Sequence, residues 1–215
     1  GAGYYMYKLY FSKARVKHQR MGVILVAIFG LAGALYVADD GFIERMYTIT
    51  SEAESLDDTK SEKQTGATRV EFWKAAWEVT KDHPFGTGAR GFEFYSPRYI
   101  PEDIATGKSR NRAVHSSWFE ALSETGFLGF LFLVLMGIAS FFSLSKVKKN
   151  LSIDTMYDEH WKMTAIQAGL ITFAISMTFI NRMRAEILYW LILYSACAYN
   201  IYVLKADKHI VKKEK

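Results

Sequence analysis

Four long apolar runs constrain the fold of this chain more than any other feature. They are Met21–Ala38, Gly126–Leu144, Met163–Ile180 and Ile187–Leu204. A helix of about 20 apolar residues is long enough to cross the hydrocarbon core of a bilayer. Half of the residues are hydrophobic although 23% are charged, and the charges lie mainly between the runs. The sequence therefore predicts an all-α protein, a polytopic membrane helix bundle with about four spans.

Lysine and arginine residues are concentrated in three short flanks of these runs. They precede the first run and follow the second and fourth, at Lys8, Lys13, Arg15, Lys17, Arg20, Lys146, Lys148, Lys149, Lys205, Lys208, Lys212, Lys213 and Lys215. Short loops rich in positive charge stay on the cytoplasmic side of a membrane. The flanks also account for the net charge of +5, so we predict no nucleic-acid partner.

This charge pattern orients the whole chain. Residues 1–20, 145–162 and 205–215 are expected to be cytoplasmic, and residues 39–112 to form a periplasmic loop. Residues 21–38 are one span, residues 113–144 a long helix that begins in the periplasm, and residues 163–204 two further spans. Because the chain opens with Gly1-Ala2-Gly3 and no Met, we expect a fragment of a larger bundle, in which Gly1–Phe11 ends a truncated preceding helix.

The periplasmic loop is predicted to contain an amphipathic helix, residues 68–82. Thr68 and Glu71 have the spacing of a capping box, and Pro84 cannot continue the helix. One face carries Arg69, Phe72, Trp73, Ala76, Trp77 and Thr80, and the other carries Glu71, Lys74, Glu78 and Lys81. The tryptophans are typical of a helix at the membrane interface, and equally of one packed on the bundle. Paired aspartates earlier in the loop lack a regularly spaced third ligand, so no metal site is predicted.

A G-x-G-x-x-G sequence at Gly86, Gly88 and Gly91 follows this helix. It does not fit a dinucleotide-binding site, which needs a preceding strand and a following helix, because neither is predicted here. The glycines suit a sharp reversal with positive φ angles. The N–H groups of Gly86 and Gly88 are candidates to face a phosphate. Residues 95–112 are predicted to be irregular.

The helix of residues 113–144 is expected to carry His115 in its first turn. At 1.5 Å per residue it is about 45 Å long, against a hydrocarbon core of about 30 Å, so its first turns must extend into the periplasm. A histidine at a helix N-terminus is biased toward its neutral form. Glu124 is a candidate to support His115, or is simply a carboxylate at the interface.

Two arginines, Arg182 and Arg184, lie in the short periplasmic turn before the last run. Their position opposes the usual cytoplasmic bias of positive charge. Either could face the same outer site as His115. A contact between Arg184 and Glu186, or with a lipid headgroup, is the alternative.

The region from Phe42 to Phe132 resembles the C-terminal half of the O-antigen ligase family, and within it the O-glycosylation ligases. The resemblance is carried by Arg69-x-x-x-Trp73, by Pro84-x-Gly86-x-Gly88-x-x-Gly91-Phe92, and by His115-Ser116-x-x-Phe119-x-x-Leu122-x-Glu124-x-Gly126. Such proteins are polyprenyl-dependent glycosyltransferases of the bacterial inner membrane. The resemblance implies transfer of a glycan from undecaprenyl pyrophosphate to lipid A core or a protein hydroxyl, among membrane lipids and without metal or cofactor.

The resemblance also assigns site residues. It implies that Arg69 engages the donor pyrophosphate and that His115 is the essential histidine. We add Arg90, Arg182, Arg184, Glu124, Gly86 and Gly88 as candidates for substrate binding. An O-antigen polymerase, which shares the donor, is one alternative function. A non-enzymatic transporter or scaffold subunit that binds lipid headgroups is another.

The chemistry of such a transfer fits these residue types. A glycosyl pyrophosphate has a good leaving group, and its developing charge needs neutralisation. Arginine supplies this with a bidentate fork. The acceptor hydroxyl needs a base, and a neutral histidine can be that base or can hydrogen-bond the phosphate.

Overall fold

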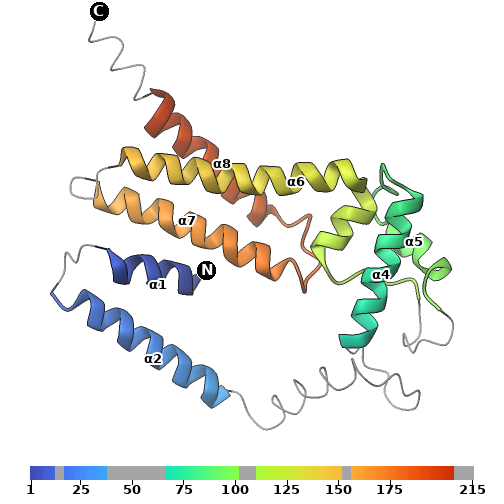
Figure 1. Ribbon diagram of the computed structural model, residues 1–215, viewed down its shortest axis with the longest axis horizontal. Helices are drawn as coiled ribbons and strands as arrows, with labels where there is room; N and C mark the ends of the chain where they lie inside the picture. The colour runs from blue at the N-terminus through green and yellow to red at the C-terminus, as the bar shows by residue number, and fades with distance from the viewer. Residues whose placement is uncertain (13–16, 38–65, 102–109, 152–155, 206–215) are drawn as a thin grey trace, which may run out of the picture.

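The computed structural model describes residues 1–12, 17–37, 66–101, 110–151 and 156–205, and this part contains helices and no strand. Its elements are α1 (Ala2–Phe11), α2 (Gln19–Val37), α4 (Gly66–Asp82), α5 (Gly91–Tyr95), the 3-10 helix η1 (Ser96–Arg98), α6 (Ser117–Asn150), α7 (Tyr157–Ser176), α8 (Glu186–Tyr199) and the π-helix η2 (Asn200–Leu204). The predicted all-α class is confirmed (Figure 1). The acidic residues 39–65 and the tail beyond Lys205 lie outside the described residues.

Three helices of the described part are long and apolar enough to cross a membrane. They are Gln19–Tyr36, Ser117–Asn150 and Glu186–Leu204, and they match three of the four predicted spans. The expected span Met163–Ile180 is not among them, because α7 starts with charged turns containing Asp158, Glu159 and Lys162 and ends at Ser176. Helix α7 still runs antiparallel to α6 and returns the chain to the end where α6 begins (Figure 1).

Helices α6, α7 and α8 share the core of the bundle, which includes Leu144, Val147, Met163, Leu170 and Leu188. Many large apolar side chains on α2, α6 and α8 are instead exposed, as expected of surfaces that a bilayer would cover. Polar contacts join the ends of α6 and α8, since Lys146 Nζ donates to the Tyr199 hydroxyl at 3.1 Å.

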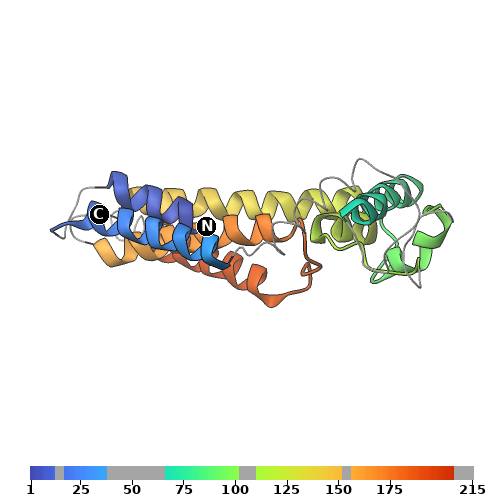
Figure 2. The same ribbon diagram turned by 90° about the horizontal axis from the view of Figure 1, so that it is seen from below.

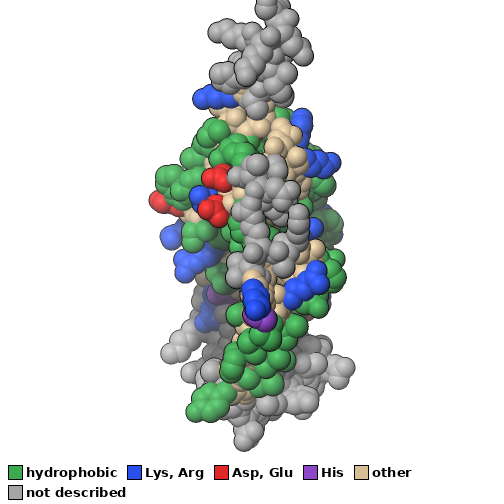
Figure 3. Space-filling view, turned by 90° about the vertical axis from the view of Figure 1, so that its left-hand side faces the viewer, with side chains coloured by type: hydrophobic (Ala, Val, Ile, Leu, Met, Phe, Trp, Pro, Cys, Tyr) green, Lys and Arg blue, Asp and Glu red, His purple; other side chains and the backbone are tan. Residues whose placement is uncertain are grey.

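The described parts of the three basic flanks meet at one end of the bundle. The turn from α1 to α2 and that from α6 to α7 lie there, and the contact between Lys146 and Tyr199 brings in the end of α8 (Figure 1). Lys and Arg side chains surround this end in the space-filling view (Figure 3). The pattern agrees with the prediction that these flanks share one side of a membrane.

A small subdomain with its own core occupies the other end, beyond the bundle (Figure 2). We call it the head; it comprises residues 66–101 and 110–125. Its buried core consists of Phe72, Ala75, Ala76, Val79, Phe92, Ile100 and Val114. Helix α4 buries Phe72, Ala76 and Thr80 of the predicted apolar face, but Trp77 of that face is 45% exposed, and Ala75 and Val79 are buried instead. The ion pairs Glu71–Lys74 and Glu78–Lys81 lie on the outer side. It begins at Gly66, so Thr68 lies inside the helix and is not its cap.

Helix α6 is broken at Gly126, where φ is 70° and ψ is −175°. The expected long helix is therefore two helices that meet at a bend, and the break falls where the apolar run begins. The turn after α4 docks on this bend. Its Thr87 and Gly88 N–H groups donate to Ser123 O and Glu124 O, both at 3.0 Å, and Phe127 N–H donates to Pro84 O at 3.0 Å. These bonds satisfy backbone groups that the break leaves without helical partners.

Candidate functional site

Arg69 lies near the start of α4, on the side that packs against the first turns of α6. Phe72, one turn further on, is fully buried. Trp73 stacks on Phe119 of α6, with ring centroids 5.5 Å apart and an interplanar angle of 13°. Side chains three and four positions apart share a helix face, so Arg69 belongs to the face that meets α6. Trp73 is therefore a packing residue rather than a membrane anchor.

His115 lies just before α6, and not in its first turn as expected. Helix α6 starts at Ser117 with Ser116 as its N-cap. His115 has a left-handed backbone, with φ of 53°, which is strained for a residue other than glycine. Its neighbours Val114 and Ser116 are each 1% exposed. The backbone is thus anchored on both sides of His115, while the imidazole stays half-buried.

Two guanidinium groups act electrostatically on His115. Burial lowers the pKa of His115 below its usual value, and the positive charges of Arg69 and Arg112 lower it further. The sequence predicted a neutral imidazole, and the lowered pKa agrees with this prediction. The largest cause of the lowered pKa is burial, however, and not the helix dipole.

Arg112 is a residue that the sequence analysis missed. It lies three residues before His115, in the segment that links the head core to α6. Arg110 fixes the start of that segment, because Arg110 O accepts from Ser96 Oγ at 2.8 Å. Among the described residues, no ion pair joins Arg69 or Arg112 to a carboxylate. The spacing Arg-x-x-His without an intervening acidic residue was the available signal.

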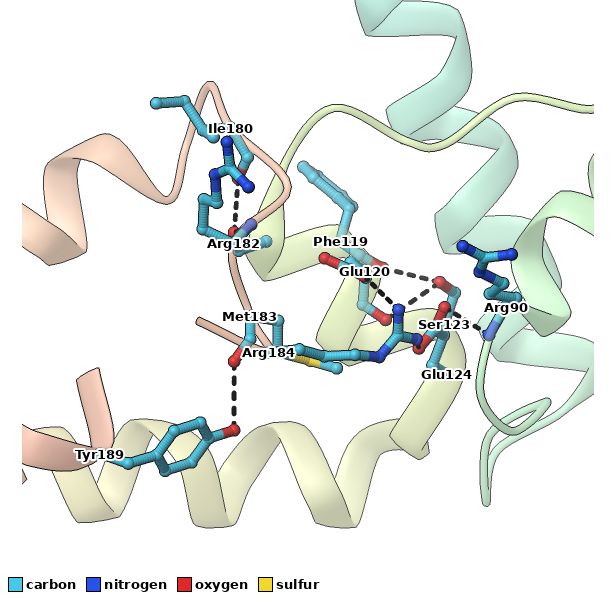
Figure 4. Close-up of polar contacts among 11 residues, drawn as sticks. Arg90, Phe119, Glu120, Ser123, Glu124, Ile180, Arg182, Met183, Arg184 and Tyr189 are labelled. Atoms are coloured by element: carbon cyan, nitrogen blue, oxygen red, sulfur yellow. Dashed lines mark hydrogen bonds and ion pairs between the residues drawn. The ribbon is translucent and has the colours of Figure 1, made fainter. Parts of the chain in front are cut away.

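Arg184 lies in a different environment, against two carboxylates of α6. It forms ion pairs with Glu124 and with Glu120, the latter at 3.4 Å between Nη1 and Oε1 (Figure 4). Both carboxylates are largely buried, whereas Arg184 is half exposed. The alternative pairing with Glu186 is not the one observed.

Glu124 connects Arg184 to the glycine turn instead of supporting His115. Its Oε1 accepts a hydrogen bond from the Arg90 N–H at 2.8 Å, and its Oε2 pairs with Arg184 (Figure 4). Arg90 is the residue before α5 and has a left-handed backbone, with φ of 58°. Among the described residues, no hydrogen bond or ion pair involves the Arg90 guanidinium, so a role in binding substrate remains a prediction for it.

The N–H groups of Gly86 and Gly88 are not directed at a ligand. They donate to His83 O at 2.8 Å and to Glu124 O at 3.0 Å. The predicted positive φ angles are confirmed, at 89° and 81°. A Cβ atom at Gly86 would lie 2.3 Å from Glu124 O, so this glycine permits close packing on α6. The structure thus gives the turn a packing role in place of phosphate binding.

Arg182 contributes its backbone to the same junction. Its N–H donates to Ser117 Oγ at 2.7 Å, and Ser117 Oγ donates to Ile180 O at 2.5 Å. The Arg182 side chain is turned away from Glu120 and Glu124 (Figure 4). Of the two outer arginines, only Arg184 therefore reaches the head through its side chain. Within the described residues, no group of three or more His, Cys, Asp or Glu could hold a metal ion.

A family model described as O-Antigen ligase matches residues 1–153, more than two thirds of the 215 residues. No curated protein and no solved structure matches the chain. The matched region extends beyond both ends of the resemblance at residues 42–132 and includes Arg69, Arg112 and His115.

The family match covers the head and all of α6, and the fold supplies three helices of membrane length in the described part. Membership implies activity of the ligase or glycosyltransferase type on a lipid-linked glycan. The chain belongs to the O-antigen ligase family of multi-pass membrane proteins.

Proposed function

We propose that this protein transfers a glycan from an undecaprenyl-diphosphate-linked donor to lipid A core or a protein hydroxyl. The reaction takes place on the periplasmic face of a bacterial inner membrane, at the head. The observation that carries the proposal is the group formed by Arg69, Arg112 and His115, in which no described carboxylate balances the positive charge. Such a group is suited to an anionic ligand.

The two guanidiniums bind the donor diphosphate and neutralise the charge that develops as the glycosidic bond breaks. The acceptor oxygen forms a bond to the anomeric carbon, and the bond from that carbon to the diphosphate oxygen breaks. The bonding electrons leave with undecaprenyl diphosphate. His115 takes the proton of the acceptor hydroxyl, and its lowered pKa keeps it in the neutral form that can do so.

The position of the head supports this assignment. It lies at the end of the bundle opposite the basic flanks (Figure 1), and positive flanks favour the cytoplasm. A polyprenyl donor keeps its tail in hydrocarbon and its sugars in water. Its diphosphate would therefore be presented near the Gly126 bend, where the apolar part of α6 begins.

The test is glycan transfer by the purified full-length enzyme in lipid nanodiscs. The donor is an undecaprenyl-diphosphate oligosaccharide, and lipid A core and an acceptor protein are supplied in separate reactions. We expect transfer to one acceptor, and a sharp loss in Arg69→Lys, which keeps the charge but loses the bidentate fork. Growth of the lipid-linked glycan itself would identify a polymerase. Donor binding without any transfer would refute an enzyme and leave a binding subunit.

A further inference from the structure

The Glu124 carboxylate is held between two segments that are far from it in sequence. Its Oε1 accepts from the Arg90 N–H, 34 residues away, and its Oε2 pairs with Arg184, 60 residues away. The Glu124 side chain is only 6% exposed. A buried carboxylate needs compensation by charge and hydrogen bonds, and these two contacts supply both.

The first turns of α6 hold the same two segments through backbone contacts. On one side, Ser123 O accepts from Thr87 N–H at 3.0 Å and from Thr87 Oγ1 at 2.9 Å. On the other side, the Ser117 N–H donates to Met177 O at 2.7 Å. The Glu124 side chain joins these two segments, because it contacts Arg90 of the first and Arg184 of the second.

Strained backbone marks the positions that this junction holds. Of the described residues other than glycine, only His18, Arg90 and His115 have positive φ. Two of these three lie here: Arg90 is bonded to Glu124 directly, and His115 precedes the turns of α6 that carry Glu124. Strained residues persist only where their surroundings fix them, and they cluster at functional sites.

We propose that Glu124, held by Arg184, is a positioning residue for glycan transfer. It fixes Arg90 and the glycine turn against the start of α6, and thereby sets the donor-binding side of the head relative to His115. The inference rests on the proposed function. Glu124 touches neither donor nor acceptor in this scheme, and its effect is on the alignment of the reacting groups.

The test compares Glu124→Gln, Arg184→Gln, Arg184→Lys and the double variant Glu124→Gln/Arg184→Gln in the nanodisc assay. Each is assayed well below its own unfolding temperature, with kcat and the donor KM measured separately. Misplacement of reacting groups by about 1 Å costs up to about 100-fold in rate. We expect each Gln variant to lower kcat by about 10- to 100-fold, and Arg184→Lys, which keeps the charge, to restore most of it.

The double variant should be no worse than either single Gln variant, because partners in one interaction are not additive. Glu78→Gln is the matched control: it removes a carboxylate from an exposed ion pair with Lys81 on α4, and its kcat should equal that of wild type. Near-normal kcat in Glu124→Gln and Arg184→Gln, or additive losses, would overturn the inference alone. A wild-type enzyme that transfers no glycan would overturn the proposed function and this inference together.

Discussion

Two groups of arginines meet the head, and their neighbours differ. Arg184 sits against the buried carboxylates of Glu120 and Glu124. Arg69 and Arg112 both act on the pKa of His115, and no carboxylate of the described residues pairs with them. Within the described residues, the same residue type therefore occurs with a paired charge in one place and an unpaired charge in another.

The difference separates structural from functional charge. A balanced arginine stabilises the segments that it joins, and removing it leaves buried carboxylates unpaired. Arg69 and Arg112 instead lower the pKa of His115, in addition to the larger effect of burial, and an anion that binds them would supply the negative charge that the described residues do not. From sequence alone, Arg69 and Arg184 were both candidate ligands of the donor, and Arg112 was not singled out.

The largest expected effect is at the unbalanced group. His115→Ala should lower glycan transfer by about 10²- to 10⁴-fold, the usual contribution of a general base. The control is His83→Ala, because His83 is also in the head but packs against Tyr95, with ring centroids 4.5 Å apart. Transfer assays in nanodiscs, with expression checked in parallel, measure both. Equal losses in His115→Ala and His83→Ala would show that His115 has no special role in transfer, and the contrast between the two groups of arginines would then carry no functional meaning.

The second largest effect is expected on stability, at the bend of α6 near Glu124 and Arg184. In Gly126→Ala, the new Cβ would lie 2.2 Å from Pro84 O and 2.6 Å from Gly86 N. The backbone conformation there is nearly exclusive to glycine, and the strain alone costs about 1–3 kcal/mol. Gly137→Ala is the control in the same helix, since its Cβ would meet nothing within 4 Å. Thermal unfolding should show a clear loss for Gly126→Ala and none for Gly137→Ala. Similar unfolding temperatures would refute the packed junction.

Much of the fold could be predicted because its signals are local. Apolar runs identify three helices that can cross a membrane, and the spacing of apolar residues identifies part of the buried face of α4, including Phe72 and Ala76 but not the exposed Trp77. The third run, Met163–Ile180, is not among the helices of membrane length and composition, because α7 starts in a charged segment, Asp158–Lys162, that the apolar window did not include. The boundary at Gly126 was predicted as the start of a span, but the bend itself was not, since a lone glycine in an apolar helix is compatible with a straight one.

The candidate site was only partly predictable because it depends on contacts between distant residues. Arg69 and His115 were predicted from their motifs, and the lowered pKa of His115 shows that the Arg69 charge acts on it. The pairing of Glu124 with Arg184 spans 60 residues, and no spacing rule indicates it. Arg112 was missed because an arginine in an irregular segment carries no periodic signal. Its spacing of three residues from His115 was the one available signal, and the lowered pKa of His115 shows that the two groups interact.

A smaller effect is expected in the pH dependence of kcat/KM. Transfer requires neutral His115, so its rate should fall as the pH drops through the histidine pKa of the free enzyme, which lies below the usual value of about 6.5. Arg112→Gln removes one of the charges that lower this pKa. The acid limb should therefore move to higher pH, toward 6.5, in addition to any loss of rate. An unchanged midpoint in Arg112→Gln would place Arg112 away from His115.

The smallest expected effect is on the unfolding temperature, and it tests whether the charges of Arg112 and Arg184 stabilise or destabilise the folded protein. In the ligand-free enzyme, Arg112→Gln removes a positive charge that no carboxylate of the described residues pairs with, and because Arg112 is partly exposed, we expect a gain in stability of at most about 1 kcal/mol. Arg184→Gln leaves two largely buried carboxylates with less compensation, so the apparent unfolding temperature should fall. Each variant removes one positive charge, and the two should shift the unfolding temperature in opposite directions. Inorganic pyrophosphate should then raise it for wild type more than for Arg112→Gln, because an anion that binds only the folded protein stabilises it by mass action. A loss of stability in Arg112→Gln as large as that in Arg184→Gln would show that Arg112 is paired after all, and the contrast between the two groups would fail.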